Sequence, residues 1–129
     1  MTAATSGVLV AYGLRARSIG HPFLFLGRHL GGFRDGIYAP GTVVVAGFLL
    51  HAAWVMAWCV AFSLVAHRAQ PGIRALLAAI TATLAHIFSA RIIGSALDTS
   101  GLGGPRWLFL YIVFAVALYL GTQIAPSRN

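Results

Sequence analysis

The chain contains 129 residues, of which 59% are hydrophobic and only 9% are charged, and its mean hydropathy is +0.84. Water-soluble domains carry about 25% charged residues, so this composition excludes an ordinary soluble enzyme. The charged side chains are all Arg or Asp, and without Lys or Glu most hydrolase and aldolase mechanisms lack the residues that they use. The single cysteine, Cys59, excludes an intrachain disulfide and a cysteine-based zinc site.

The first part of the chain, residues 1–39, is rich in Gly and Arg. Its apolar stretches, Val8–Leu14 and Phe23–Leu26, are too brief to cross a bilayer. A secretory signal peptide is not expected, because no basic residue precedes Val8–Leu14 and Arg15 ends this stretch. We expect an interfacial or extramembrane segment in which Pro22–Leu30 forms a short helix. Phe23, Phe25 and Leu26 would face the membrane in this helix. An irregular tail is the alternative.

Residues 40–129 contain three apolar segments that are long enough to cross a bilayer, which needs roughly 20 residues at about 1.5 Å each. They cover about 42–66, 73–97 and 107–125, and Pro and Gly residues precede each of them. Short connections make neighbouring helices antiparallel. The predicted fold class is therefore an all-α membrane protein, with a domain of three antiparallel transmembrane helices after the N-terminal segment.

The arginines near the ends of these segments predict the orientation of the chain. More of them lie beside the N-terminal segment and the second loop than beside the first loop and the C-terminus. The first group is Arg15, Arg17, Arg28, Arg34 and Arg106, with Arg91 within snorkelling reach, and the second group is Arg68, Arg74 and Arg128. Because cytoplasmic loops carry the excess of positive residues, we expect a cytoplasmic N-terminus in a bacterial inner membrane. The net charge of +7 then indicates contacts with lipid headgroups rather than with nucleic acid.

Two histidines, His51 and His86, lie inside the first and second apolar segments, each about seventeen residues from the centre of the connecting loop. In an antiparallel pair their imidazoles lie at one depth, as bis-histidine ligation of a haem requires. A small residue, Gly47 or Ala82, precedes each histidine by one turn. This spacing resembles the histidine sites of light-harvesting and reaction-centre helices, which implies ligation of a chlorophyll magnesium. His51 and His86 are therefore candidate axial ligands of haem b or of a (bacterio)chlorophyll.

The same histidines have a simpler interpretation, which the sequence favours. Neutral imidazoles also join helices by hydrogen bonds, to each other or to a hydroxyl such as that of Thr81, Thr83 or Ser89. Contact with a cofactor that another subunit holds is a third alternative.

Arg91 is the charged residue that lies deepest in an apolar segment, where an arginine costs from about 2.5 kcal/mol upward. It should face protein, the interface, a haem propionate or a quinone carbonyl, and snorkelling toward Asp98 is the favoured explanation. His86, Arg91 and Asp98 resemble the second helix of the membrane-anchor subunits of succinate dehydrogenase, three-helix chains with a haem-ligating histidine followed by an arginine and an aspartate. The spacing from histidine to arginine is one residue shorter here, and the family's motif at the start of the first helix is missing, so membership is not assigned.

Three sets of side chains indicate packing faces. An aromatic stripe on the first segment would fill gaps against lipid tails or stack on a pigment; it consists of His51, Trp54, Trp58 and Phe62. Small residues give the second segment small faces for close helix approach; they are Ala75, Ala79, Ala82, Ala90 and Gly94. A row on the third segment has polar tips that need partners, expected from a neighbouring protein; it consists of Tyr111, Ala115, Tyr119 and Gln123.

Together these features predict a small accessory or structural subunit of a larger energy-transducing membrane complex, respiratory or photosynthetic. Helix packing, bound lipid and contacts with other membrane subunits would hold it there. The alternative is a haem- or chlorophyll-binding electron-transfer or pigment subunit, similar to a quinone-oxidoreductase membrane anchor, with His51 and His86 as ligands and Arg91 beside the cofactor. No catalytic residue and no nucleic-acid partner are expected. A transporter or channel would need oligomerisation, because three helices enclose no pathway.

Overall fold

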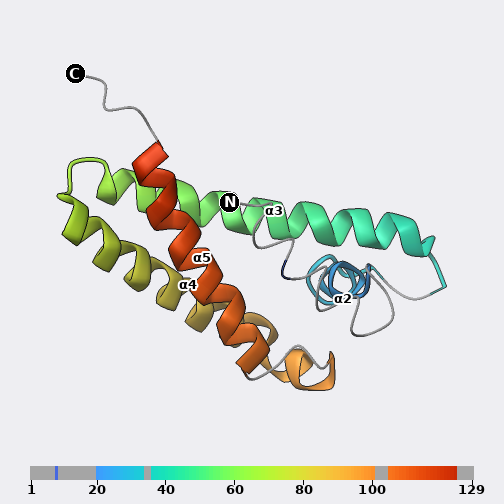
Figure 1. The fold of residues 1–129 in the computed structure, drawn as a ribbon. Coiled ribbons are helices and arrows are strands. Elements are labelled where there is room, and N and C mark those ends of the chain that lie inside the picture. Colours follow the sequence, from blue (N-terminus) through green and yellow to red (C-terminus); the bar gives the residue numbers. More distant parts are fainter. Residues whose placement is uncertain (1–7, 9–19, 34–35, 101–104, 125–129) are drawn as a thin grey trace.

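A computed structural model describes residues 8, 20–33, 36–100 and 105–124 of the chain, without the side chains of residues 21, 93–100, 106, 107 and 124. Helices and short connections account for these ranges, and no strand occurs in them. The helices are α2 (His21–Leu30), α3 (Pro40–Ala66), α4 (Pro71–Ser100) and α5 (Pro105–Ile124), as Figure 1 shows.

Two of these helices, α3 and α4, are long and apolar enough to cross a membrane. The 27 residues of α3 extend over about 40 Å, and in α4 the stretch Pro71–Ile92 is apolar among the described side chains. In α5, which has 20 residues, the described apolar side chains cover Leu108–Gln123. Among the described residues two helices are thus candidate membrane-spanning helices, and the third crossing stays a prediction.

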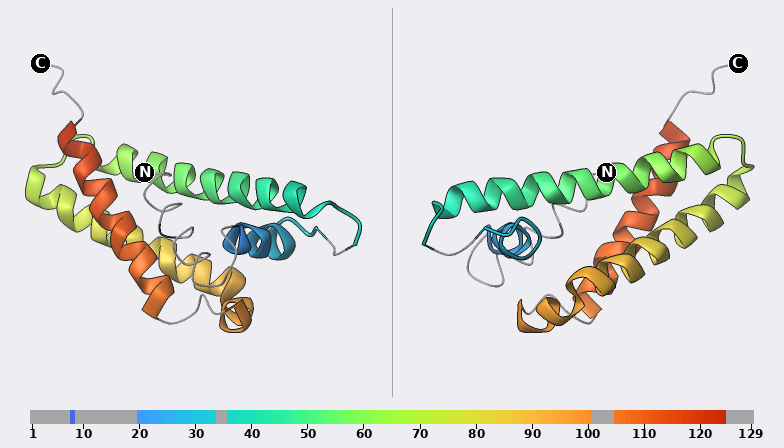
Figure 2. Two further views of the ribbon diagram at one scale, coloured as in Figure 1. Left: turned by 45° about the vertical axis from the view of Figure 1, so that its right-hand side comes forward. Right: turned by 180° about the vertical axis from the view of Figure 1, so that it is seen from behind.

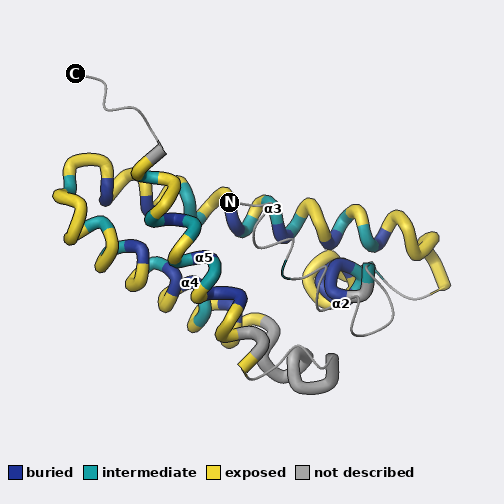
Figure 3. Tube along the Cα trace, viewed as in Figure 1, coloured by how far each residue is buried: buried dark blue, intermediate teal, exposed yellow. Residues whose placement is uncertain are grey.

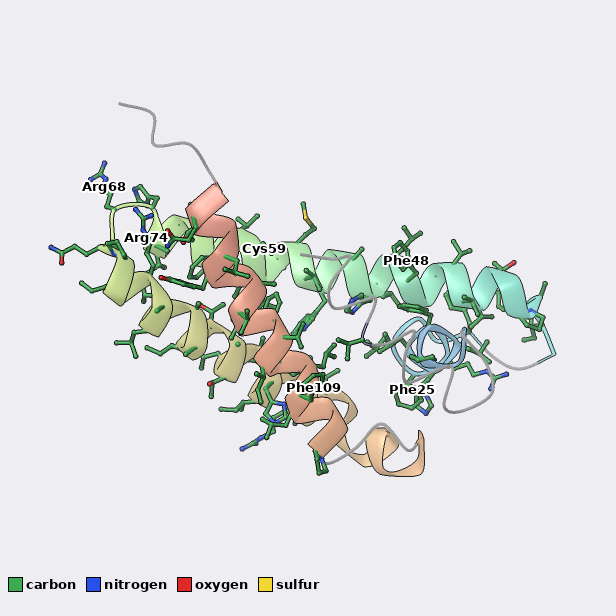
Figure 4. All side chains as sticks on the ribbon, viewed as in Figure 1. Phe25, Phe48, Cys59, Arg68, Arg74 and Phe109 are labelled. Atoms are coloured by element: carbon green, nitrogen blue, oxygen red, sulfur yellow. The ribbon has the colours of Figure 1, made fainter. Side chains whose placement is uncertain are left out.

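Proline residues mark the beginnings of the three long helices. Pro40, Pro71 and Pro105 each occupy the first position of their helix, where the missing N–H costs nothing and the fixed φ favours the helix. The helices consequently begin about two residues before the predicted segments, because proline lies within the first turn rather than in front of it. At the turn between α3 and α4, Arg74 Nε donates to the carbonyl oxygen of Ala69 at 2.7 Å. Figure 4 shows Arg68 and Arg74 together at this end of the molecule.

The short helix expected in the N-terminal segment is present as α2, but its apolar face is covered by protein. Phe23, Phe25 and Leu26 are only 6–7% exposed. The Phe23 ring meets Phe48 of α3 edge to face, with ring centroids 5.6 Å apart. The expectation that these side chains turn toward lipid is therefore wrong, because protein covers them, and Phe23 packs against α3.

The backbones of α2 and α3 touch where the two helices cross, at a steep angle that Figures 1 and 2 both show. A Cβ atom added to Gly47 would lie 1.8 Å from the carbonyl oxygen of Phe23. A Cβ atom added to Gly27 would lie 2.3 Å from the carbonyl oxygen of Val43. Only glycine at these two positions permits the observed approach.

From their connecting turn, α3 and α4 diverge, so that the two helices form an open V with α2 near its wide end (Figure 2). α5 packs along α4 and contributes Leu110, Phe114 and Leu118 to the buried core. The face of α4 that faces this core is formed by Ala78, Ala82, Ala85 and Ser89.

Of the small residues predicted to give α4 its packing faces, only some lie in the contact within the described chain. Ala82 is buried, Ala75, Ala79 and Ala90 are exposed, and the side-chain surroundings of position 94 lie outside the described residues. The actual contact face follows a neighbouring stripe of the same helix. An alanine-rich helix offers small residues on several faces, so spacing alone does not identify the one that packs.

Large apolar side chains remain exposed along all three long helices. Figure 3 shows the exposed positions of these helices in yellow. Only 22% of the most apolar window is buried in α3, and the same share is buried in α4. The described part of the chain therefore covers little of its apolar surface by itself.

Candidate functional site: a cavity between the four helices

A cavity of about 390 Å³ lies between α2, α3 and the α4–α5 pair. Leucines of α2 and α3, together with side chains of α4 and α5, make its wall predominantly apolar. The apolar lining includes Leu26, Leu30, Leu50, Ile92, Leu110 and Phe114. Four side chains that carry polar atoms also reach it, namely His51, Trp54, Ser89 and Tyr111. All four helices are thus needed to form the cavity.

Ser89 and Tyr111 form a directed pair of hydrogen bonds on one side of the cavity. The Ser89 hydroxyl donates to the carbonyl oxygen of Ala85 at 2.6 Å, and its oxygen also bonds to the Tyr111 hydroxyl. A serine has one hydroxyl proton, so in this arrangement Tyr111 is the donor to Ser89.

Trp54 supplies a buried donor to the same region. Its Nε1 atom is buried and has no hydrogen-bond partner in the described part of the chain. The indole lies beside the Tyr111 hydroxyl without meeting the geometry of a hydrogen bond. A buried donor that lacks an acceptor costs about 1–3 kcal/mol.

The two candidate ligand histidines occupy different surroundings. His51 is buried and lines the cavity. The centroids of its ring and of the Phe23 ring are 6.1 Å apart. The ring of His86 lies 5.3 Å from that of Tyr111, and its Nδ1 atom is buried without a partner among the described residues. His86 does not line the cavity. The structure therefore brings both histidines near the Tyr111 region but only His51 to the cavity wall.

The small residues that precede the histidines do not leave an open slot. At Gly47, the space for a side chain is filled by the α2 backbone, and Ala82 is buried in the core. Two of the three hydroxyls proposed as histidine partners donate elsewhere: Thr83 donates to the carbonyl oxygen of Ala79 at 2.8 Å, and Ser89 donates to that of Ala85. Cofactor ligation by His51 and His86 stays a prediction.

Arg91 does not reach the cavity. Its side chain is exposed, and it is absent from the cavity wall. The predicted partner, Asp98, has a side chain outside the described residues, so the pairing stays a prediction. Within the residues that the structure covers, no group of three or more His, Cys, Asp or Glu side chains forms a metal site.

The aromatic stripe of α3 faces protein rather than lipid. Trp54 and Trp58 meet edge to face at 5.8 Å, and Trp58 lies 5.9 Å from Phe88 of α4, between ring centroids. Phe62 is 5% exposed at the narrow end of the V. The stripe therefore fills the space between α3 and α4.

Sequence reasoning identified Tyr111 as a side chain that needs a partner but placed that partner in another protein. The structure supplies it within the chain, at Ser89. The donor of Trp54 was missed, although an indole in the middle of an apolar segment is a detectable signal, because its N–H cannot bond to its own helix backbone.

Neither the family models, the curated protein sequences nor the solved structures gave a match to this chain.

Proposed function

We propose that the chain is a small accessory subunit of a larger energy-transducing membrane complex, in which it packs against other membrane subunits and lipid. The observation that carries this proposal is the open V of α3 and α4, whose apolar outer faces stay uncovered. A chain that crosses the membrane alone needs lipid around each helix, whereas a subunit of a complex exchanges part of that lipid for protein helices.

The finer topology belongs to this proposal. α5 forms a third crossing, for which its 20 residues provide the usual length. The N-terminus and the loop between α4 and α5 lie in the cytoplasm of a bacterium, and the turn between α3 and α4 lies on the opposite side, as the positive-inside rule favours. α2 crosses α3 at Val43–Gly47, near the start of the helix, which fits a position at the membrane interface.

Bulky substitutions on exposed helix faces test the subunit role, because lipid tails adapt to an indole and a packed protein interface does not. Leu49→Trp in α3, Leu76→Trp in α4 and Leu120→Trp in α5 each change a side chain that is 51–60% exposed. The tagged chain is extracted from its native membrane in mild detergent and separated by native electrophoresis. We expect the unchanged chain to migrate in a large species with the absorbance of a respiratory or photosynthetic complex. At least one tryptophan variant should leave that species.

The three variants control one another, because each alters one helix only and leaves the buried core unchanged. Migration of the unchanged chain as a free 13.6 kDa protein, with all three variants behaving alike, would contradict the proposal.

A cofactor on the histidines is the second candidate function, favoured by the position of His51 on the cavity wall and by the unpartnered Nδ1 of His86. Absorbance spectra of the chain and its complex, with and without His51→Ala and His86→Ala, test it. Loss of a Soret or near-infrared band in either variant supports ligation. Retention of every chromophore in both variants excludes it.

A further inference from the structure

The turn between α3 and α4 gathers positive charge at the narrow end of the V. Arg68 lies in the turn itself and is exposed, and Arg74 belongs to the first turn of α4. Arg74 Nε donates to the carbonyl oxygen of Ala69, the residue next to Arg68, so the guanidinium of Arg74 is folded back over the turn. The two cationic groups therefore lie at the same end of the molecule, where Figure 4 labels them.

The charge of this turn has no counterion within the described part of the chain. The sequence contains two acidic residues: Asp35 precedes the start of α3, and Asp98 lies in the last turn of α4. The turn joins the opposite ends of these two helices. Among the described residues, the Arg68 guanidinium and the terminal nitrogens of Arg74 have no hydrogen-bond or ion-pair partner. Their N–H groups are thus available to an outside acceptor, and a guanidinium fits the oxygens of a phosphate group.

The start of α4 adds to the attraction for an anion. A helix N-terminus carries a partial positive charge, and its first backbone N–H groups have no partner within the helix. A Cβ atom added to Gly72 would meet nothing within 4 Å, so the surface beside the first turn of α4 is open. A negatively charged group can therefore approach this helix end and the two arginines together.

Large apolar side chains lie beside the arginines on both helices. Leu64 in the last turn of α3, with Ile73 and Leu76 in the first two turns of α4, is part of a surface whose side chains are 50–71% exposed. A soluble anion would cover the charge and leave this apolar surface bare. A phospholipid covers both, because its acyl chains continue from the phosphate toward the middle of the bilayer.

We propose that the turn between α3 and α4 is a binding site for an anionic phospholipid of the phosphatidylglycerol class. Arg68 and Arg74 bind the phosphate, and the acyl chains lie along Leu64, Ile73 and Leu76. A zwitterionic lipid fits less well, because the arginines repel its ammonium group. This inference rests on α3 and α4 crossing a membrane, but it does not rest on the subunit role, because a single chain in lipid has the same turn.

Native mass spectrometry of the full chain in detergent tests the site, because it counts the lipid molecules that remain bound. Phosphatidylglycerol is the anionic probe, and phosphatidylcholine with the same acyl chains is the zwitterionic probe. We expect one phosphatidylglycerol to bind saturably and more tightly than phosphatidylcholine. Equal affinities for the two lipids would overturn the proposal and leave an acidic protein surface as the partner of the turn. Neither result changes the outcome of the native electrophoresis that tests the subunit role.

Arg68→Gln and Arg74→Gln should each weaken the binding of phosphatidylglycerol about fivefold, the effect expected for one arginine at an anionic lipid. Their affinity for phosphatidylcholine should change little. Arg68 makes no hydrogen bond in the described part of the chain, so its replacement preserves the turn even if that of Arg74 disturbs it. Arg28→Gln is the matched control, because it removes the same charge from α2, near the wide end of the V (Figure 2). An equal loss in all three variants would show attraction to the net charge alone and would overturn the site.

Two water-soluble probes distinguish a lipid from a free phosphate. Inorganic phosphate and glycerophosphoglycerol, which is the headgroup without acyl chains, should not displace phosphatidylglycerol when each is present at the concentration of the lipid. Displacement by either compound would show that the turn binds a soluble phosphate, and the assignment to a lipid would be wrong.

Discussion

Gly47 lies so close to the backbone of α2 that only a hydrogen atom fits in place of a side chain. A Cβ atom at this position would lie 1.8 Å from the carbonyl oxygen of Phe23, which belongs to the backbone of α2 and cannot rotate away. Any side chain here must displace the whole helix α2. The residue therefore determines the position of a complete element.

Gly47→Ala should lower the free energy of unfolding by about 1–3 kcal/mol, as overpacking of a tight contact does. Gly41→Ala is the control, because a Cβ atom there meets nothing within 4 Å. The control should be neutral or slightly stabilising, since alanine favours a helix over glycine. Thermal unfolding in detergent, followed by circular dichroism, measures both. Equal melting temperatures would show that α2 does not dock on α3 as described.

The hydrogen bond between Tyr111 and Ser89 is a second feature at the level of single residues. Its contribution to the free energy of unfolding can be measured as the coupling energy of a double-mutant cycle. Tyr111→Phe and Ser89→Ala each remove one partner of the same hydrogen bond. Hydrogen bonds between membrane helices contribute about 0.6 kcal/mol on average. The double variant should therefore be less destabilised than the sum of the single variants, by roughly 0.6–1 kcal/mol. Strict additivity in chemical denaturation would show that the two hydroxyls do not interact.

Among the elements, α2 is the one whose role the sequence left undetermined. Its bounds followed from Pro22 and from the glycines after Leu30, and the prediction differs from the structure by one residue. Its packing partner did not follow, because an apolar helix face has the same sequence pattern whether lipid or protein covers it. The contact depends on Gly27 and Gly47, which lie far apart in the chain and match only in three dimensions.

Docking of α2 on α3 can be tested by a disulfide. A Cβ atom at Gly20 would lie 3.2 Å from Cγ2 of Val44, close enough for two cysteines to bond. In a Cys59→Ala background, Gly20→Cys with Val44→Cys should form an intramolecular disulfide under mild oxidation, seen as a change in gel mobility that a reductant reverses. Gly20→Cys with Val45→Cys is the control, because Val45 is 58% exposed on another face. Equal yields for the two pairs would contradict the observed crossing.

The long helices were more predictable than their arrangement. Composition and proline positions indicated where α3, α4 and α5 begin to within about two residues, because a run of apolar residues after Pro has few alternatives to a helix. The angle between α3 and α4 did not follow from the short turn, which predicts antiparallel neighbours but not their divergence. The same limitation applies to the cavity, since residues from four helices form it and no local pattern connects Trp54 with Tyr111.

At the scale of the whole molecule, the number of membrane crossings is the quantity to measure. If α5 crosses, the C-terminus lies on the same side as the turn between α3 and α4. Reporter fusions at the C-terminus and within residues 67–70 should then lie on the same side of the membrane. A fusion at the N-terminus should lie on the opposite side. Enzymatic reporters that are active only in the cytoplasm or only outside it measure this. A C-terminal reporter on the side of the N-terminus would show that only α3 and α4 cross.

The contact between α2 and α3 also has a consequence for synthesis and insertion. α2 leaves the ribosome before α3, and with 10 residues it is too short to insert as a crossing of its own. Its docking surface does not exist until α3 has entered the membrane. During this interval the face with Phe23 and Leu26 has only the bilayer surface to cover it. We therefore expect α2 to lie at the membrane surface until α3 has inserted. The short link of residues 31–39 keeps α2 close to α3 during this interval.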